Sequence, residues 1–227
     1  TKTKPWLKKM WCIQEITPEY RKRMYDILDL YAEEYDAKRP VIGLDEKPKQ
    51  LLGEKRKPIL MKQGKPEKYD YEYVRNGKAN IFVSVEPKGG ERYASVTHSR
   101  KREDFALFIK NLVNKYENAE KIRIVLDNLN THNEISLYNT FDKNEAQKIL
   151  DKIEFHYTPK HASWLNVAEI EIGSMDTECT RRRIGDIHKL TKEVNAWAKM
   201  RNKKQIKIIW KFTKQDADKK LSKHYVT

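Results

Sequence analysis

The sequence contains little of what stabilises small secreted or fibrous proteins. Its 227 residues include only two cysteines, Cys12 and Cys179, with eight glycines and eight prolines. Two cysteines supply neither a disulfide framework nor a structural zinc site, and so little glycine and proline excludes a collagenous or linker-like chain. No apolar run approaches the roughly eighteen residues of a membrane span, and the first ten residues lack the apolar stretch of a secretion signal. We therefore expect a cytoplasmic protein with no membrane partner.

The chain is strongly basic, and its charge is unevenly distributed. Lysine and arginine number 47 against 33 acidic residues, a formal net charge of +14. Residues 181–227 hold 15 basic and 4 acidic residues, whereas residues 79–180 hold 13 and 16. A basic rim around a less basic centre is typical of an enzyme that binds phosphates at its edge and cations at its centre. A solvated C-terminal helix is the alternative explanation.

Hydrophobic residues make up 38% of the chain, too many for a disordered polycation. We expect a helix from Pro18 with Thr17 as its N-cap, a buried strand over 41–44 that ends in Asp45, and a loop or flap over 46–68. The Asn76-Gly77 pair predicts a hairpin turn between strand-like runs in 71–85. Further strands are predicted over 93–97, 121–126 and 153–157, and helices over 102–116, 134–152 and 186–201, with one more after Ser163. This order predicts an α/β fold with a mixed central sheet, an antiparallel meander plus parallel strands, flanked by helices.

Two of the predicted strands end in an aspartate, Asp45 and Asp127. Ligand sites in α/β sheets lie outside the strand ends, so both carboxylates are expected at one site. Like charges held close together need an opposing charge, and carboxylate oxygens select magnesium or manganese over zinc. A lone acid at a strand end is more often a turn former or a helix cap, so the pair carries the argument.

The helix after Ser163 offers two candidates for a third acid. On a helical wheel, one apolar stripe is formed by Leu165, Ala168, Ile172, Met175 and Cys179. Glu169 and Glu171 lie on opposite flanks of this stripe, so periodicity does not choose between them. Both also suit the start of a helix as ordinary solvent-facing acids.

Three ordered segments carry a family resemblance. They are Gly43-Leu-Asp45-Glu46-Lys47-Pro48, Val125-Leu-Asp127-Asn128-Leu-Asn130-Thr-His132, and residues 156–171, which include Leu165-Asn166-Val-Ala-Glu169. Together they resemble the motifs of DDE transposases, and most closely the bacterial insertion-sequence branch of the mariner-like superfamily. The resemblance extends over nearly the whole chain.

The resemblance implies an RNase H-like fold in which Asp45, Asp127 and Glu169 are catalytic and bind two Mg²⁺ ions, with Mn²⁺ as a substitute. Glu169 aligns with the family's Leu-Asn-x-x-Glu pattern, which leaves Glu171 as the alternative third ligand. The 41 residues between Asp127 and Glu169 exceed the usual interval, so residues 134–152 are expected to add a helix.

The resemblance also divides the chain. Residues 1–16 resemble an interdomain linker, and residues 17–227 form an RNase H-like DDE catalytic domain with a basic C-terminal region. The family's N-terminal helix-turn-helix DNA-binding region is absent, as in a catalytic-domain fragment or a naturally shortened product.

The implied activity is metal-dependent DNA strand cleavage at transposon ends and strand transfer into target DNA, at a TA dinucleotide by family resemblance. The implied partner is double-stranded DNA, with a homodimer on DNA as a further state, and the implied location is the prokaryotic cytoplasm at the nucleoid. Two alternatives remain: an RNase H-like nuclease or resolvase without strand transfer, and a repurposed, non-catalytic DNA-binding protein.

Other residues are candidates for supporting roles. The polar residues nearest the acids are expected to orient DNA or to support the metal ligands, or alternatively to satisfy turns and caps: Asn128, Asn130, His132, His161 and Asn166. The basic side chains expected to contact the DNA backbone are Arg181, Arg182, Arg183, Lys199, Lys203 and Lys204.

Overall fold

The computed structural model describes residues 15–226. The linker-like segment predicted over residues 1–16 therefore lies almost wholly outside the described residues. The helices and strands follow in this order: α1 (Pro18–Ala32), β1 (Val41–Glu54), β2 (Tyr73–Glu86), β3 (Glu91–Thr97), α2 (Arg102–Lys115), β4 (Ile122–Leu126), α3 (Glu134–Thr140), α4 (Lys143–Lys152), β5 (Ile153–Tyr157), η1 (Ser163–Leu165), α5 (Ala168–Met175), the π-helical turn η2 (Asp176–Thr180), α6 (Ile187–Lys203), α7 (Lys214–Leu221) and η3 (Ser222–His224).

The five strands form one mixed sheet in the order β3-β2-β1-β4-β5. The first three are antiparallel neighbours, whereas β4 runs parallel to β1 and β5 parallel to β4. The predicted antiparallel meander plus parallel strands is confirmed. In the parallel pair, Gly43 lies opposite Val125. Because side chains alternate along a strand, Asp45 and Asp127, each two residues further on, emerge at the same level and on the same face.

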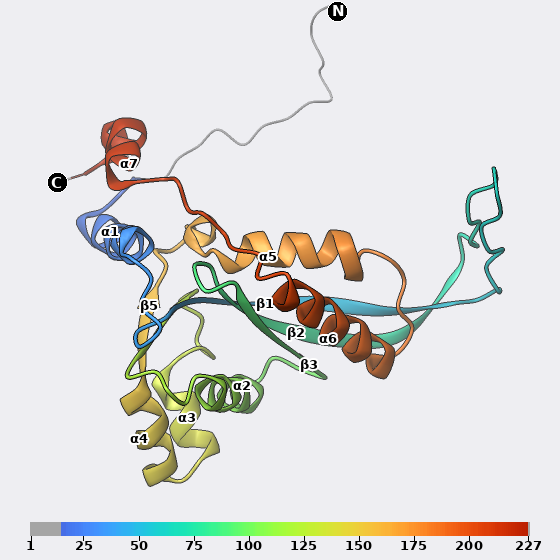
Figure 1. Cartoon of the computed structure of the whole chain (residues 1–227), viewed down its shortest axis with the longest axis horizontal. Coiled ribbons are helices and arrows are strands. Elements are labelled where there is room, and N and C mark those ends of the chain that lie inside the picture. Colours follow the sequence, from blue (N-terminus) through green and yellow to red (C-terminus); the bar gives the residue numbers. More distant parts are fainter. Residues whose placement is uncertain (1–14, 227) are drawn as a thin grey trace, which may run out of the picture.

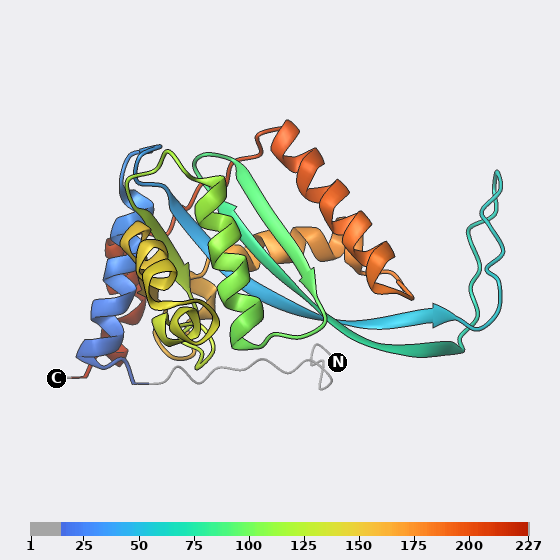
Figure 2. The ribbon, with the colours of Figure 1, turned by 90° about the horizontal axis from the view of Figure 1, so that it is seen from below.

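Helices cover both faces of the sheet (Figures 1 and 2). Phe82 of β2 faces a core that it shares with α2, α3 and α4, and its neighbours Ile81 and Val83 face a second core with α5 and α6. A third cluster joins α1 and α7 to the strand ends at Val85 and Val125. No helix among the described residues is long and apolar enough to cross a membrane.

The strand that carries Asp45 is longer than expected. Instead of giving way to a flap at residue 46, β1 continues to Glu54 and pairs with β2 along this length. The two strands form a ribbon, here called the arm, which extends beyond the helices and ends in residues 55–72 (Figure 1). Pairing with β2 supplies hydrogen-bond partners for a segment that has little apolar pattern of its own, so periodicity did not reveal it.

The hairpin turn predicted at Asn76-Gly77 is wrong, because β2 runs straight through this pair. The register shifts there, since Gln50 pairs with Lys78 and Leu52 with Arg75, which sets two residues of β2 against one of β1. Gly77 has a φ of 99°. A β-bulge and a hairpin turn both use the left-handed conformation that glycine adopts readily, so the dipeptide signal is the same for either.

The predicted helices are largely confirmed, with one division. Thr17 and Asp186 cap α1 and α6 as N-caps, accepting bonds from the backbone N–H groups of Tyr20 and Lys189. The single helix expected over 134–152 is two helices, because the Asp142 carboxylate accepts bonds from the next helix's first N–H groups and so starts α4. The whole apolar stripe predicted along residues 165–179 is buried.

Gly43 gives a first test of this architecture. A Cβ at this position would lie 2.5 Å from Cγ1 of Val167 and 3.0 Å from the backbone nitrogen of Ala168. We expect Gly43→Ala to destabilise the fold by about 1–3 kcal/mol in urea unfolding, because the start of α5 must move away from β1. The control is Gly173→Ala within α5, where a Cβ meets nothing within 4 Å; it should be neutral or stabilising by up to ~1 kcal/mol. Equal effects of the two substitutions would contradict the close approach.

Candidate active site

One oxygen of each aspartate accepts a hydrogen bond from a nearby residue. Oδ1 of Asp45 accepts the backbone N–H of Glu46 at 2.8 Å, and Oδ1 of Asp127 accepts the hydroxyl of Thr158 at 2.8 Å. The backbone N–H of Thr158 in turn donates to the carbonyl of Leu126, just past the last paired residues of β4 and β5. Each carboxylate thus keeps its second oxygen for another partner.

Asn166 connects the third motif to the first. Its side chain is fully buried, its amide nitrogen donates to the carbonyl of Leu44 at 2.9 Å, and its amide oxygen accepts the N–H of Ala168 at 3.1 Å. One side chain therefore ties the residue before Asp45 to the first residue of α5. Glu169 follows immediately, exposed in the first turn of this helix.

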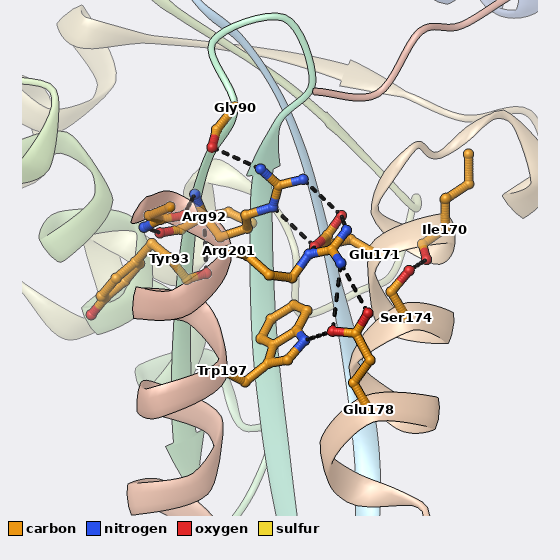
Figure 3. Close-up of polar contacts among 11 residues, drawn as sticks. Gly90, Arg92, Tyr93, Ile170, Glu171, Ser174, Glu178, Trp197 and Arg201 are labelled. Atoms are coloured by element: carbon orange, nitrogen blue, oxygen red, sulfur yellow. Dashed lines mark hydrogen bonds and ion pairs between the residues drawn. The ribbon is translucent and has the colours of Figure 1, made fainter. Parts of the chain in front are cut away.

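Glu171 lies elsewhere. Its carboxylate is fully buried and forms ion pairs with Arg92 and Arg201, at 2.9 and 2.6 Å (Figure 3). With both oxygens facing arginines, Glu171 is not oriented as the alternative third ligand. The arginines come from positions 79 residues before and 30 residues after it, so no local pattern distinguishes Glu171 from Glu169.

Asp45 lies close enough to Asp127 and Glu169 for their charges to act on its pKa. Burial is the largest cause that raises the pKa of Asp45, to about 8, and the charges of Asp127 and Glu169 raise it in addition. The N–H bond from Glu46 opposes this shift. A buried carboxyl group that other acids also face gains from a nearby positive charge, which favours its ionised form.

The donor chemistry fits a hard divalent cation. All three acids offer carboxylate oxygens, the ligands that magnesium and manganese prefer, and a cation would relieve the repulsion acting on Asp45. Within residues 15–226, no three His, Cys, Asp or Glu side chains are placed so as to hold a metal ion together. The fit therefore rests on donor type and mutual charge.

Sequence reasoning missed a buried pair beside this site. The side chains of Glu46 and His132 are 4% and 2% exposed, and Oε2 of Glu46 lies 3.3 Å from Nε2 of His132. Burial raises the pKa of Glu46 to about 6 and lowers that of His132 to about 4, so the imidazole is neutral at pH 7. The ring stacks on Phe105 of α2, with centroids 4.7 Å apart. His132 thus packs the loop after Asp127 against the sheet.

Two of the other predicted polar residues, Asn128 and His161, border an open cavity. A cavity of about 840 Å³ is lined by Asp127, Asn128 and His161, together with residues from the start of α1. Asn128, Asn130 and His161 are exposed, and His161 has a φ of 62°. The structure thus gathers two of the predicted orienting residues around Asp127, whereas Asn166 and His132 are buried behind it.

The three consecutive arginines divide into two kinds. Arg181 and Arg182 are exposed and line a second cavity, of about 500 Å³, together with Lys189 and Tyr69. Arg183 also lines this cavity, but it binds the base of the arm: its Nη1 contacts Glu54 at 2.9 Å and the carbonyl of Asp70 at 2.8 Å. Beside it, the N–H of Leu52 donates to Ile184 and the Asn76 amide to Gly185, so residues 183–185 fasten the arm at the bulge.

The remaining predicted DNA contacts lie on or just after α6. Lys199 and Lys203 are exposed on this helix, and Lys204 follows it. At 100° per residue, Lys189 and Lys192 fall on the same side of α6, within about 80° of the other two. None of the four makes an ion pair within the part of the chain that the structure describes.

Asp45 and Asp127 lie two residues past the last parallel pair of β1 and β4, and Glu169 lies on α5, after β5. A mixed sheet with acids in this arrangement is typical of the class of RNase H-like enzymes that act through carboxylates. A family model described as DDE superfamily endonuclease matches residues 40–191. The chain belongs to this family, as the three motifs predicted.

Solved structures agree on the fold. The pre-cleavage Mos1 transpososome matches with a TM-score of 0.56 at 14% identity, over 90% of this chain and 67% of that one. The Mos1 strand transfer complex matches with a TM-score of 0.50 at 14% identity, over 90% and 66%. The catalytic domain of Mos1 mariner transposase matches with a TM-score of 0.50 at 12% identity, over 86% and 96%. The predicted RNase H-like fold is therefore confirmed, and the chain spans about two thirds of the Mos1 chains in the two assemblies. No curated protein matches the sequence.

The raised pKa of Asp45 predicts how stability depends on pH. Between about pH 5 and 8, the folded metal-free protein keeps a proton on Asp45 that the unfolded chain has released, so rising pH destabilises the fold by up to about 1.4 kcal/mol per unit. Asp45→Asn removes this titration. In thermal unfolding with EDTA, the Tm advantage of the variant should grow from pH 5 to 8, and saturating Mg²⁺ should reverse it. Parallel Tm curves for the two proteins would contradict the assignment.

Proposed function

We propose that the protein is a transposase that cleaves DNA strands at transposon ends and joins the freed 3′ end to target DNA. The observation that carries this proposal is the register of β1 against β4, which sets Asp45 and Asp127 side by side in a chain of the DDE endonuclease family. The names of the Mos1 neighbours, a pre-cleavage transpososome and a strand transfer complex, support both steps.

In this proposal Asp45, Asp127 and Glu169 hold two Mg²⁺ ions, with Mn²⁺ as a substitute. Bound there, the ions would activate the attacking hydroxyl and stabilise the leaving oxygen of the phosphodiester. Asp45 must give up its proton for this, which the positive charge favours. Thr158 and Asn166 hold Asp127 and the start of α5, so that the acids are oriented before DNA arrives.

The proposed reaction has two steps. Water is the nucleophile in the first step, and the 3′-hydroxyl released by it is the nucleophile in the second. No covalent bond to the enzyme is needed. The cavity beside Asp127, with Asn128 and His161 at its wall, is open enough to admit the strand that carries the scissile phosphate.

Double-stranded DNA, both transposon end and target, is the proposed partner, and nucleoid association would follow from such binding. The α6 track is the name used here for Lys189, Lys192, Lys199 and Lys203 on the solvent side of α6 together with Arg181 and Arg182 just before it. All six are exposed, and Arg182 also forms an ion pair with Glu193 of α6. Cations of this kind hold the phosphate backbone without reading sequence. A TA target and a homodimer on DNA rest on the family resemblance.

The activity is tested with the purified chain, a pre-nicked transposon-end duplex, Mg²⁺ and a TA-rich plasmid. Strand joining is expected, and Asp45→Asn and Glu169→Gln should each lower it at least ~100-fold, because each removes a charged ligand. Cleavage without joining would favour the nuclease or resolvase, and DNA binding with neither reaction would favour the repurposed binding protein. Full activity of Asp45→Asn would exclude the carboxylate site.

The α6 track is tested by salt titration of DNA binding. Lys199→Gln combined with Lys203→Gln should lower the slope of log K against log salt by about 1.8, because each neutralised phosphate contributes about 0.9. The matched control is Lys143→Gln with Lys148→Gln, two exposed lysines of α4 on the other side of the sheet. An equal slope for the two double variants would exclude the track.

A further inference from the structure

Glu171 is the centre of a buried cluster that joins three elements. Arg92 of β3 meets its carboxylate with two parallel bonds, Nε to Oε1 at 2.9 Å and Nη2 to Oε2 at 3.0 Å. Arg201 of α6 approaches from the other side, with Nε 2.6 Å from Oε1 (Figure 3). The side chains of Glu171 and Arg92 are fully buried, and that of Arg201 is 10% exposed.

The cluster extends outward through a second acid. Glu178, in the π-helical turn after α5, accepts a bond from Nη1 of Arg201 at 3.1 Å and one from Nε1 of Trp197 at 2.8 Å. On the inner side, Asn202 bonds both backbone groups of Arg92, at 2.8 and 2.9 Å. Two carboxylates therefore balance two guanidinium groups, and α5, the turn after it, α6 and β3 are fixed to one another.

Stability alone is a poor explanation for such a cluster. Removing charges from water is costly, and buried ion clusters of this kind are often replaced by apolar side chains without loss of stability. A two-bond contact between an arginine and a carboxylate fixes the relative orientation of the two groups, because both N–H donors must align with both oxygens. The apolar stripe of α5 lacks this property, since hydrophobic contact is not directional.

The direction matters because Glu169 lies on the same short helix. At 100° per residue, Glu169 projects about 160° away from Glu171. A rotation of α5 about its axis that breaks the ion pairs of Glu171 therefore also moves the carboxylate of Glu169. With side chains about 5–6 Å from the helix axis, a 20° rotation displaces the Glu169 carboxylate by roughly 2 Å. Metal ligands tolerate only about 0.2 Å. Asn166 fixes the position of the first residue of α5. The rotation of α5 about the helix axis must be set by contacts later in the helix.

We propose that Glu171, Arg92 and Arg201 are positioning residues that set the rotation of α5 and thereby aim Glu169 at Asp45 and Asp127. The inference rests on the proposed function, because it assigns the cluster a purpose only if Glu169 binds metal. It predicts that the cluster controls metal affinity independently of fold stability.

The test replaces the cluster with apolar side chains of similar size, in the variant Arg92→Met/Glu171→Leu/Arg201→Met. Its Tm should stay near that of the wild type, since no buried charge is left unpaired. The Mn²⁺ concentration at half-saturation, called the Mn²⁺ midpoint, is measured from the signal of free Mn²⁺ by electron paramagnetic resonance. It should rise 10- to 100-fold, the usual cost of losing residues that orient a metal ligand. A wild-type midpoint in the folded triple variant overturns the inference.

Two further variants keep the result decisive. Arg201→Lys retains the charge but not the two-bond contact, so it should fold and raise the midpoint several-fold even where the triple variant does not fold. Leu112→Ala, in the core on the other face of the sheet, lowers Tm without touching α5 and should leave the midpoint unchanged. A midpoint that tracks Tm across all these variants would make the cluster purely structural and overturn the inference.

The same measurements distinguish a wrong metal site from a wrong positioning role. Wild type should bind Mn²⁺ and Asp45→Asn should not. If wild type binds no Mn²⁺, the metal site and the positioning role are both wrong. If wild type binds, Asp45→Asn does not, and the cluster variants match wild type, only the positioning role is wrong.

Discussion

The parallel pairing of β1 with β4 is the constraint on which the site depends. It holds Asp45 beside Asp127 although their charges repel, and the pKa of Asp45 is raised chiefly by burial and further by that repulsion. A shift of one residue in this register would turn one aspartate to the opposite face of the sheet. The apolar cores oppose such a shift, because neighbouring residues of β4 are buried in different clusters, Ile124 with α2, α3 and α4 and Val125 with α1.

The helix that carries the third acid is fitted onto this pair. Gly43 lets the start of α5 lie against β1, and Asn166 bonds across the contact to Leu44. Glu171 then fastens the helix from the far side, to β3 and α6. The three acids thus come from three segments distant in sequence, and α5 is held in place by the missing side chain of Gly43, by Asn166 and by Glu171.

Sequence predicted whatever is encoded locally. Periodicity and N-cap chemistry predicted the strands over 121–126 and 153–157, the Thr17 cap, the helix from about Asp186 and the buried stripe of α5. Long-range partners decided the rest. A helical wheel does not distinguish Glu169 from Glu171. The two differ only in the fold, where Arg92 of β3 and Arg201 of α6 form ion pairs with Glu171. Asn76-Gly77 permits a turn or a bulge, and only the continued pairing of β1 selects the bulge.

The arm has a mechanical consequence for catalysis. β1 is one continuous strand from Val41 to Glu54, so the backbone that holds Asp45 also bears any torque applied to the arm's end. Bonds from Leu52, Asn76 and Arg183 fasten the arm near the bulge, between its tip and the acid. These bonds brace the arm between its tip and Asp45, so a force on the tip is shared between β1 and residues 183–185 before it reaches Asp45.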